Sequence, residues 1–244
     1  MEIRRLIGYR DSFAPAEVSF PASLLADVSV ARWLRQHRQS IDVRTMPELH
    51  SAISVGIHPA FVTVHAERFT AADLGCLSRM GVGRVVVSCT EHIALLGAGS
   101  DGHTQQVLLR MTDVAATGNE HRRFHFDSRD ADFAVEAIVT RRSLKLIGLQ
   151  CDVGTAVDDF VSYPAAIGNM IAQMEDIRRE HGTVLTRLGL AGGAIATSGD
   201  GSVVRQDLAE EIDESVDDAC ATLRFPRPVV VISAGSQIFE RRAA

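Results

Sequence analysis

Three charged side chains that could do chemistry stand near the ends of short apolar runs: Asp42, Arg110 and Asp152. A carboxylate accepts a proton or pairs with a cation, and a guanidinium group binds carboxylate or phosphate oxygens as a fork. If folding brings the three together, they form a candidate catalytic site. The alternative is that Asp42 makes a structural ion pair, with Arg44 or Arg110 as its cation.

Glycines at the ends of two other apolar runs could bind an anion. They are Gly192, Gly193 and Gly235. Because glycine has no Cβ, backbone N–H groups beside it can approach a phosphate closely. The sequence therefore predicts a small anion-binding site, with tight turns as the simpler interpretation of the same residues.

Amine chemistry is confined to one residue. Lysine and arginine together number 25, and Lys145 is the one lysine among them. Any reaction that needs a lysine amine as nucleophile must use Lys145 or be absent. Since Lys145 stands at the start of the apolar run 144–153, at the wrong end for a barrel active site, we predict a structural role for it.

Metal ligands are present without a diagnostic spacing. His65, Cys89 and Asp152 offer an imidazole, a thiolate and a carboxylate, all of which zinc accepts. The four cysteines form no C-x-x-C pair. We therefore predict no metal site, and expect reduced cysteines.

The elements that must position these residues alternate regularly along the chain. Short runs rich in β-branched residues predict strands, and the amphipathic stretches between them predict helices. The predicted strands cover 20–25, 40–45, 61–66, 84–89, 106–111, 144–153, 187–193 and 228–235. The predicted helices cover 28–37, 47–55, 71–80, 91–96, 130–141, 163–181 and 206–223.

Near-continuous apolar runs such as VVVS, LIGLQC and VVVIS are typical of parallel strands that are buried on both faces. Eight such strands predict an α/β fold of the (β/α)8 TIM-barrel type, as a single domain over 1–244 with its barrel core at about 20–236. A doubly wound open sheet is the alternative, but no G-x-G-x-x-G follows the first strand. In a barrel, the strands' carboxyl ends carry the chemistry.

Composition excludes several classes of function. The chain has 244 residues and a formal net charge of −6, with no block rich in lysine and arginine. Nucleic acid therefore lacks its usual electrostatic attraction to the protein. No apolar run approaches the roughly 20 residues that span a bilayer, and the N-terminus lacks the apolar core of a signal peptide. We expect a cytoplasmic protein that binds neither nucleic acid nor membrane.

Five blocks of the sequence form one ordered pattern: IDVRTMPEL at 41–49, RFHF at 123–126, IGLQCDVGT at 147–155, LGLAGG at 188–193 and PVVVISAGS at 228–236. Taken in this order, they resemble the PLP-dependent decarboxylases that act on diaminopimelate, ornithine and arginine. IDVRTMPEL at 41–49 resembles the family's F-D-V-A-S-x-x-E-L, RFHF at 123–126 its K-F-G-I, and IGLQCDVGT at 147–155 its G-L-H-C-H-I-G-S. LGLAGG at 188–193 stands where the family has L-D-L-G-G-G, and PVVVISAGS at 228–236 stands where a strand ends in E-P-G-R. The resemblance implies the PLP-binding barrel of the alanine racemase-like fold. It also implies a cofactor position lined by Gly192, Gly193, Gly235, Ser236 and Thr155.

Departures from the family pattern fall on the cofactor contacts. Counting back from Asp42 without a gap, the family's Schiff-base lysine falls on Ser23. The histidine that stacks on the pyridine ring falls on Asp152, the glutamate that pairs with the pyridine nitrogen on Ser233, and the phosphate-binding arginine on Ser236. A covalent link between a lysine and PLP is therefore not expected. The family's C-terminal β-domain has no counterpart in these 244 residues.

These departures lead to two expectations about function. The first is a degenerate homologue that binds an anionic or phosphorylated small molecule, or a protein partner, without lysine-linked PLP catalysis. The second is an active decarboxylase or racemase-like enzyme that holds PLP non-covalently or uses the barrel mouth for other chemistry. Because the resemblance implies an active site shared between two chains, we also expect a homodimer or a complex with a full-length relative, with Phe124, Phe126 and Phe239 as apolar contacts.

Overall fold

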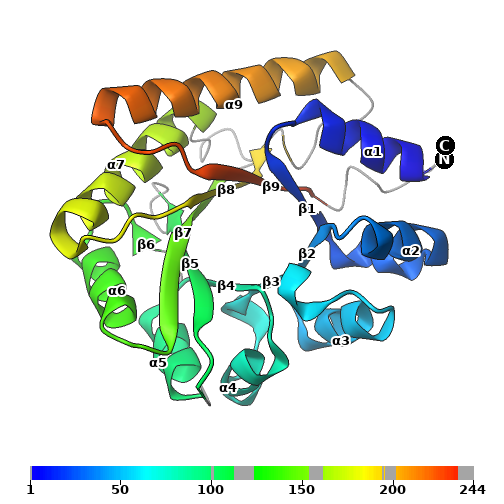
Figure 1. The fold of residues 1–244 in the computed structure, drawn as a ribbon, viewed down its shortest axis with the longest axis horizontal. Coiled ribbons are helices and arrows are strands. Elements are labelled where there is room, and N and C mark those ends of the chain that lie inside the picture. Colours follow the sequence, from blue (N-terminus) through cyan, green and yellow to red (C-terminus); the bar gives the residue numbers. More distant parts are fainter. Residues whose placement is uncertain are drawn as a thin grey trace, which may run out of the picture.

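A closed barrel of parallel strands forms the centre of the computed structural model, which describes residues 2–99, 102–112, 124–153, 162–193, 195 and 202–235 (Figure 1). Within these residues the sheet order is β4-β3-β2-β1-β9-β8-β7-β5, and pairing of β4 with β5 closes the ring. The barrel strands are β1 (Glu17–Pro21), β2 (Ser40–Val43), β3 (Val62–His65), β4 (Arg84–Val87), β5 (Gln105–Thr112), β7 (Leu144–Val153), β8 (Arg187–Gly192) and β9 (Val229–Ser233). The short strand β6 (Phe124–His125) pairs with the end of β5.

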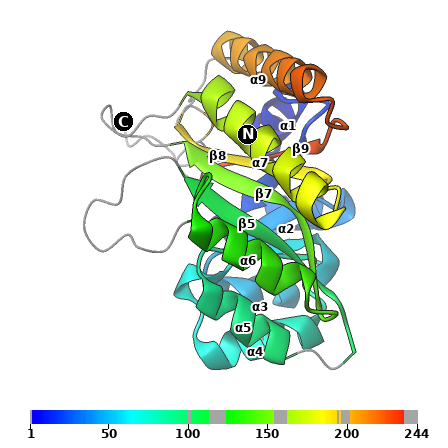
Figure 2. The same cartoon turned by 90° about the vertical axis from the view of Figure 1, so that its left-hand side faces the viewer.

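Helices surround the barrel on its outside (Figure 1). They are α1 (Glu2–Ser12), α2 (Val28–Gln36), α3 (Met46–Ser54), α4 (Ala71–Met80), α5 (Thr90–Ala98), α6 (Arg129–Val139), α7 (Tyr163–His181) and α9 (Ser202–Leu223). The short 3-10 helices of the described residues, η1 (Ala22–Ala26), η2 (Pro59–Phe61) and η3 (Ala66–Arg68), lie beside strand ends. Helices α7 and α9 pack against each other, and α7 also packs on β7 (Figure 2).

Local signals fix where several helices begin and end. Asp27 accepts hydrogen bonds from the first amides of α2, and Thr45 does so for α3. Thr70 and Asp73 form a reciprocal capping box at the start of α4. Gly182 ends α7 in the left-handed region, where glycine has no Cβ penalty.

The barrel is buried on both sides, as expected for parallel strands. Every residue of β3 and β4 is buried. Val85 and Val87 belong to the large core cluster between strands and helices. Since alternate residues of a strand point to opposite faces, Val86 points into the barrel, where it forms a separate small cluster with Leu108 and Ile147. The barrel interior thus has an apolar layer of its own.

The predicted (β/α)8 barrel is confirmed, and the open sheet is excluded because β4 pairs with β5. The first predicted strand, 20–25, is wrong. The strand is Glu17–Pro21, and Ala22–Ala26 forms the 3-10 helix η1. Helix α1 precedes that strand and lies outside the predicted helices.

Two further observations concern surfaces. Phe124 is only 4% exposed, so it cannot form the expected apolar contact patch, whereas Phe126 is partly exposed and its role as a contact stays a prediction. Phe239 lies outside the described residues. Among the residues that the structure describes, no helix combines the length and the apolar character needed to cross a membrane.

Candidate functional site

Strand alternation brings a set of polar residues to the inside of the barrel mouth. The outward neighbours of these residues, for example Ile41 and Val43 on either side of Asp42, belong to the core cluster between strands and helices. The residues between must therefore point inward. The inward set near the carboxyl ends is Ser19 of β1, Asp42 of β2, His65 of β3, Arg110 of β5, Gln150 and Asp152 of β7, and Ser233 of β9.

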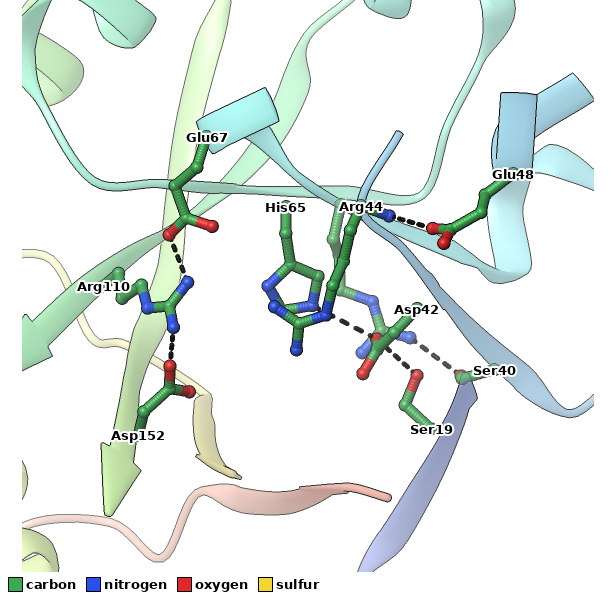
Figure 3. Close-up of polar contacts among 10 residues, drawn as sticks. Ser19, Ser40, Asp42, Arg44, Glu48, His65, Glu67, Arg110 and Asp152 are labelled. Carbon is green, nitrogen blue, oxygen red and sulfur yellow. Dashed lines mark hydrogen bonds and ion pairs between the residues drawn. The ribbon is translucent and has the colours of Figure 1, made fainter. Parts of the chain in front are cut away.

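Asp42 lies at the centre of one group of contacts (Figure 3). It is 5% exposed and accepts a hydrogen bond of 2.6 Å from the Ser19 hydroxyl. His65 Nε2 is 3.7 Å from the same carboxylate oxygen, and the His65 side chain is fully buried. Burial by itself raises the pKa of Asp42, but the His65 ring and the hydroxyls of Ser19 and Ser233 outweigh burial and hold the pKa below its usual value. Asp42 is therefore a stable anion at neutral pH.

Arg110 lies at the centre of a second group. Its guanidinium group pairs with the carboxylates of Glu67 and Asp152, and its side chain is only 7% exposed (Figure 3). Burial raises the pKa of Glu67, but the charge of Arg110, followed by that of His65, outweighs burial and lowers the pKa. Two carboxylates thus share one buried cation.

Glu67 connects the two groups, because its carboxylate interacts electrostatically with both Arg110 and His65. Several buried polar atoms between the groups have no hydrogen-bond partner within the described part of the chain. They are both ring nitrogens of His65, Nε2 of Gln150, Oδ1 of Asp152 and Oγ of Ser88. Unpaired buried polar atoms are costly, so this set suits a bound polar molecule or ordered water.

The Ser19, Asp42 and His65 set differs from a nucleophile triad. In a triad the histidine stands between the hydroxyl and the carboxylate, so that it can take the hydroxyl proton. Here the carboxylate of Asp42 stands in the middle, and the Ser19 hydroxyl donates a hydrogen bond to that carboxylate. The arrangement orients the serine and holds an imidazole beside an anion, which suits binding and proton exchange by His65 rather than attack by Ser19.

The glycines at the end of β8 are required by close packing. Gly192 has a φ of +79°, and a Cβ there would lie 2.0 Å from the carbonyl oxygen of Val153. Gly193 has a φ of +49°, and a Cβ there would lie 2.6 Å from the Tyr163 hydroxyl. That hydroxyl donates to the Gly192 carbonyl and accepts from the Ile195 amide. One amide beside these glycines is therefore already bonded within the protein, and the anion cradle stays a prediction.

The remaining residues of the predicted cofactor position divide into two groups. Gly235 lies two residues after the end of β9. Thr155 and Ser236 lie outside the described residues.

Cys89 precedes helix α5 at its N-cap position. Among the described residues, no group of three or more histidine, cysteine and acidic side chains is placed to hold a metal ion.

The residues present do not fit a lysine-linked cofactor. Lys145 is the second residue of β7 and is exposed, eight residues before the carboxyl end of the strand at Val153. Ser23 lies on η1 and is exposed. Ser19 is the β1 residue that contacts Asp42. Since the sequence has no second lysine, no lysine amine can reach the mouth.

The structure places the three predicted catalytic residues in two groups of contacts, and a catalytic role for them stays a prediction. Arg110 and Asp152 pair, but the predicted partner of Asp42, Arg44 or Arg110, is wrong. Ser19 and His65 surround Asp42 instead, and the backbone amide of Arg44 donates to Glu48. The neighbouring strands β1 and β3 place the Ser19 hydroxyl and the His65 imidazole inside the barrel, beside the buried carboxylate of Asp42.

Sequence reasoning missed three site residues, Ser19, Glu67 and Gln150, the last of which lies within the predicted strand 144–153. Ser19 was missed because the first strand was placed three residues too late. Glu67 lies on η3, two residues beyond His65 at the end of β3. A signal for Glu67 existed: an acidic residue just after a strand end is well placed to reach a barrel mouth.

Comparison with known proteins identifies relatives of the whole described barrel. Residues 2–240 match the model of the pyridoxal-dependent decarboxylase family's pyridoxal-binding domain. The chain is 32% identical to the diaminopimelate decarboxylase of Actinosynnema pretiosum subsp. auranticum, over 97% of this chain and 56% of that protein. It is 28% identical to the diaminopimelate decarboxylase of Corynebacterium efficiens, over 92% of this chain and 52% of that protein. The chain thus spans a little more than half the length of these relatives.

Solved structures show the same fold. The diaminopimelate decarboxylase of M. jannaschii matches with a TM-score of 0.78 and 14% identity, over 97% of this chain and 59% of that chain. The lysine/ornithine decarboxylase of Vibrio vulnificus in complex with cadaverine matches with a TM-score of 0.75 and 16% identity, over 96% of this chain and 59% of that chain.

Proposed function

The chain belongs to the pyridoxal-dependent decarboxylase family through its pyridoxal-binding domain, and from that premise we propose that it binds a small anionic molecule at the barrel mouth without lysine-linked PLP catalysis. One observation carries the proposal. The single lysine, Lys145, is exposed at the amino end of β7, while the mouth presents serine, carboxylate, imidazole and guanidinium groups. Without an amine, the family's covalent chemistry has no nucleophile.

The position of the missing lysine follows from the neighbourhood of Asp42. The family resemblance implies that this aspartate lies near the catalytic lysine. Ser19, on the adjacent strand, donates a hydrogen bond to Asp42, whereas Ser23 is exposed on η1. We therefore assign the lysine position to Ser19.

Polar donors at the mouth support an anionic ligand. Arg110 supplies a buried positive charge, although Glu67 and Asp152 already share it. His65 Nε2 faces Asp42, but His65 Nδ1 and Gln150 Nε2 lack hydrogen-bond partners among the described residues and can be satisfied by a ligand's oxygen atoms. In this proposal the ion pair of Arg110 with Asp152 keeps charged groups at the mouth, and His65 and Gln150 contact the ligand.

A labelling experiment tests the absence of lysine-linked PLP. The protein is incubated with PLP, reduced with borohydride and mapped by mass spectrometry, beside the matched variant Lys145→Arg. We expect no stoichiometric label at a single site in either protein. A stoichiometric adduct on Lys145 that disappears in the variant would overturn the proposal.

A thermal-shift experiment tests the anion site. Phosphate or PLP should raise the melting temperature by mass action, because a ligand that binds only the native state stabilises it. Gln150→Met keeps the shape of a side chain whose Nε2 is unpartnered, so it should leave stability nearly unchanged and reduce the shift. The matched control is Gln173→Met: Gln173 is buried on α7 and accepts from the Asp127 amide, so its loss should cost stability but leave the shift intact. An equal shift in wild type and Gln150→Met would contradict this site.

Non-covalent catalysis is a second candidate, favoured by the imidazole of His65 beside the buried anion of Asp42. Such a pair can exchange a proton with a bound substrate. The test is release of CO2 from diaminopimelate in the presence of PLP, because the relatives in the comparison carry that name. Release that is lost in His65→Gln would favour this second candidate over the first.

A further inference from the structure

A cavity lies at the end of the barrel opposite the mouth. Its volume is about 490 Å³, and its lining includes the first residues of four strands: Glu17 of β1, Ser40 of β2, Arg84 of β4 and Arg187 of β8. Strands in this barrel are parallel, so these residues mark its amino end. Small-molecule sites have volumes of about 300–1,000 Å³, and this cavity falls within that range.

The apolar layer inside the barrel separates this cavity from the mouth. On β4, buried Val86 follows Arg84 by two residues and points to the same interior face. On β5, Leu108 precedes Arg110 by two residues. The two polar ends of the barrel therefore lie on opposite sides of the cluster that Val86 and Leu108 form with Ile147.

Positive charge exceeds negative charge in the cavity lining. Arg10, Arg38, Arg84 and Arg187 line it, and Glu17 is the one acidic residue among the lining residues. Arg187 Nη1 is 2.7 Å from Oε2 of Glu17, and Arg84 Nη1 is 3.7 Å from the same oxygen. One carboxylate oxygen thus serves two guanidinium groups.

The two outer arginines differ in how they are neutralised. Arg10 donates to Asp11 through Nε at 3.0 Å and Nη2 at 2.8 Å, so its charge is largely compensated. Arg38 is exposed and forms no ion pair within the described residues. Arg84 and Arg187 therefore share Glu17, and Arg84 also interacts with the charge of Asp42, whereas the charge of Arg38 is left uncompensated among the described residues.

Burial makes this excess charge significant. The Arg84 side chain is 10% exposed, and its Nη2 donates to the Ser40 hydroxyl at 3.3 Å. Its burial, and next the like charge of Arg187, lower the pKa of Arg84. A guanidinium group in such a place is stabilised by a planar anion that it can bind as a fork.

An apolar surface continues from the charged one. A neighbouring cavity of about 420 Å³ shares Arg38, Gln39, Ala60 and Phe61 with the first, and its lining continues over Leu34 and Ile57. The rings of His58 and Phe61 pack edge to face at its border. Together the two cavities offer one cationic half and one apolar half.

We propose that the amino end of the barrel is a second binding site, for a small organic anion that carries a phosphate or carboxylate group on an apolar body. The anionic group pairs with Arg187, Arg84 and Arg38, and the apolar body contacts Phe61 and Ile57. The residues of this site belong to the other end of the strands from the mouth, and the charge of Arg84 also interacts with that of Asp42.

Calorimetric titration with phenyl phosphate tests this site, with inorganic phosphate and phenol as probes of each half alone. We expect phenyl phosphate to bind saturably and with higher affinity than inorganic phosphate or phenol. Loss of one charge-assisted hydrogen bond weakens binding by about tenfold, so Arg187→Gln and Arg38→Gln should each weaken it by about that factor. Arg38 is exposed and unpaired, so its variant should fold as wild type does, even if Arg187→Gln does not.

Two controls separate this site from the mouth. Arg179→Gln removes an exposed arginine of α7 and should not change the affinity. Gln150→Met should remove only the binding that belongs to the mouth and should leave unchanged the binding step that Arg38→Gln weakens. Binding that Gln150→Met weakens and Arg38→Gln leaves intact would place the ligand at the mouth and overturn this inference. Absence of phenyl phosphate binding to the wild type would also overturn it.

Discussion

Replacing Arg110 with methionine should destabilise the protein strongly at neutral pH. The variant keeps most of the side-chain volume but leaves the carboxylates of Glu67 and Asp152 without their shared cation. Breaking a buried ion pair by removal of one partner costs about 3–5 kcal/mol. Because the Glu67 and Asp152 side chains are 26% and 18% exposed, water screens part of this cost. We therefore expect a loss near the lower limit, about 3 kcal/mol at pH 7.

The pH dependence of this loss has a definite sign. In the wild type the pKa of Glu67 is lowered, so its contribution to stability is present above its usual pKa and disappears as pH falls through the lowered value. Without Arg110, burial is opposed only by the charges of His65 and Arg44, so we expect the pKa of Glu67 to rise from its lowered value. The penalty is then present at pH 7 and is relieved as pH falls through the raised value. The difference in unfolding free energy between wild type and Arg110→Met should therefore shrink from pH 7 to pH 5.

Urea unfolding at both pH values measures this difference. The matched control is Arg179→Met on α7, where the arginine side chain is 67% exposed and pairs with Asp176 and, at 3.6 Å, with Glu175. Exposed ion pairs contribute about 0–1 kcal/mol, so the control should lose little at either pH. A loss for Arg110→Met that is no larger than the control's, or that grows toward pH 5, would refute the reasoning.

Three further predictions concern the lysine position, the β8 glycines and association. Ser19→Lys should gain a borohydride-trapped PLP adduct, because Asp42 lies 2.6 Å from the Ser19 hydroxyl. Ser23 is exposed, so Ser23→Lys should be labelled no better than Lys145. Equal labelling of the two variants would contradict this prediction. An alanine in the left-handed region costs roughly 1–2 kcal/mol. Gly192→Ala should lower the unfolding free energy, measured in urea, by well over that amount, because its Cβ meets the Val153 carbonyl oxygen. Gly182→Ala, whose Cβ meets open space, should lose only that amount. Light scattering over a dilution series should show a homodimer, since the family resemblance implies a shared active site, and a mass that stays near 26.4 kDa at high concentration would count against it.

Much of the barrel could be predicted because its strands are nearly continuous apolar runs. The run at 144–153 has the boundaries of β7, since both faces of that strand are buried. The first strand was misplaced for a physical reason. Leu24 and Leu25 extend the apolar pattern past Pro21, but they belong to the 3-10 helix η1, whose Leu25 packs into the core. A short apolar run does not distinguish a strand from a turn of helix.

The candidate site was predictable in location but not in its pairings. The rule that chemistry lies at the carboxyl ends of barrel strands selected Asp42, Arg110 and Asp152, and all three point into the mouth. The partners that these side chains contact depend on the register between neighbouring strands of the barrel. Arg110 aligns with Gln150 and reaches Asp152 two residues further along β7, a relation that spacing along the sequence does not contain.

The conclusion about lysine chemistry is independent of the error in the first strand. Moving the family's lysine position from Ser23 to Ser19 changes which serine stands there, but it does not supply an amine. The one lysine is fixed at the amino end of β7 by the pairing of Gln106 with Lys145, a strand length away from the mouth. For Lys145 to reach Asp42, β7 would have to leave its register with β5 and β8. A composition fact, one lysine in 244 residues, therefore limits the chemistry of this barrel more firmly than any single alignment.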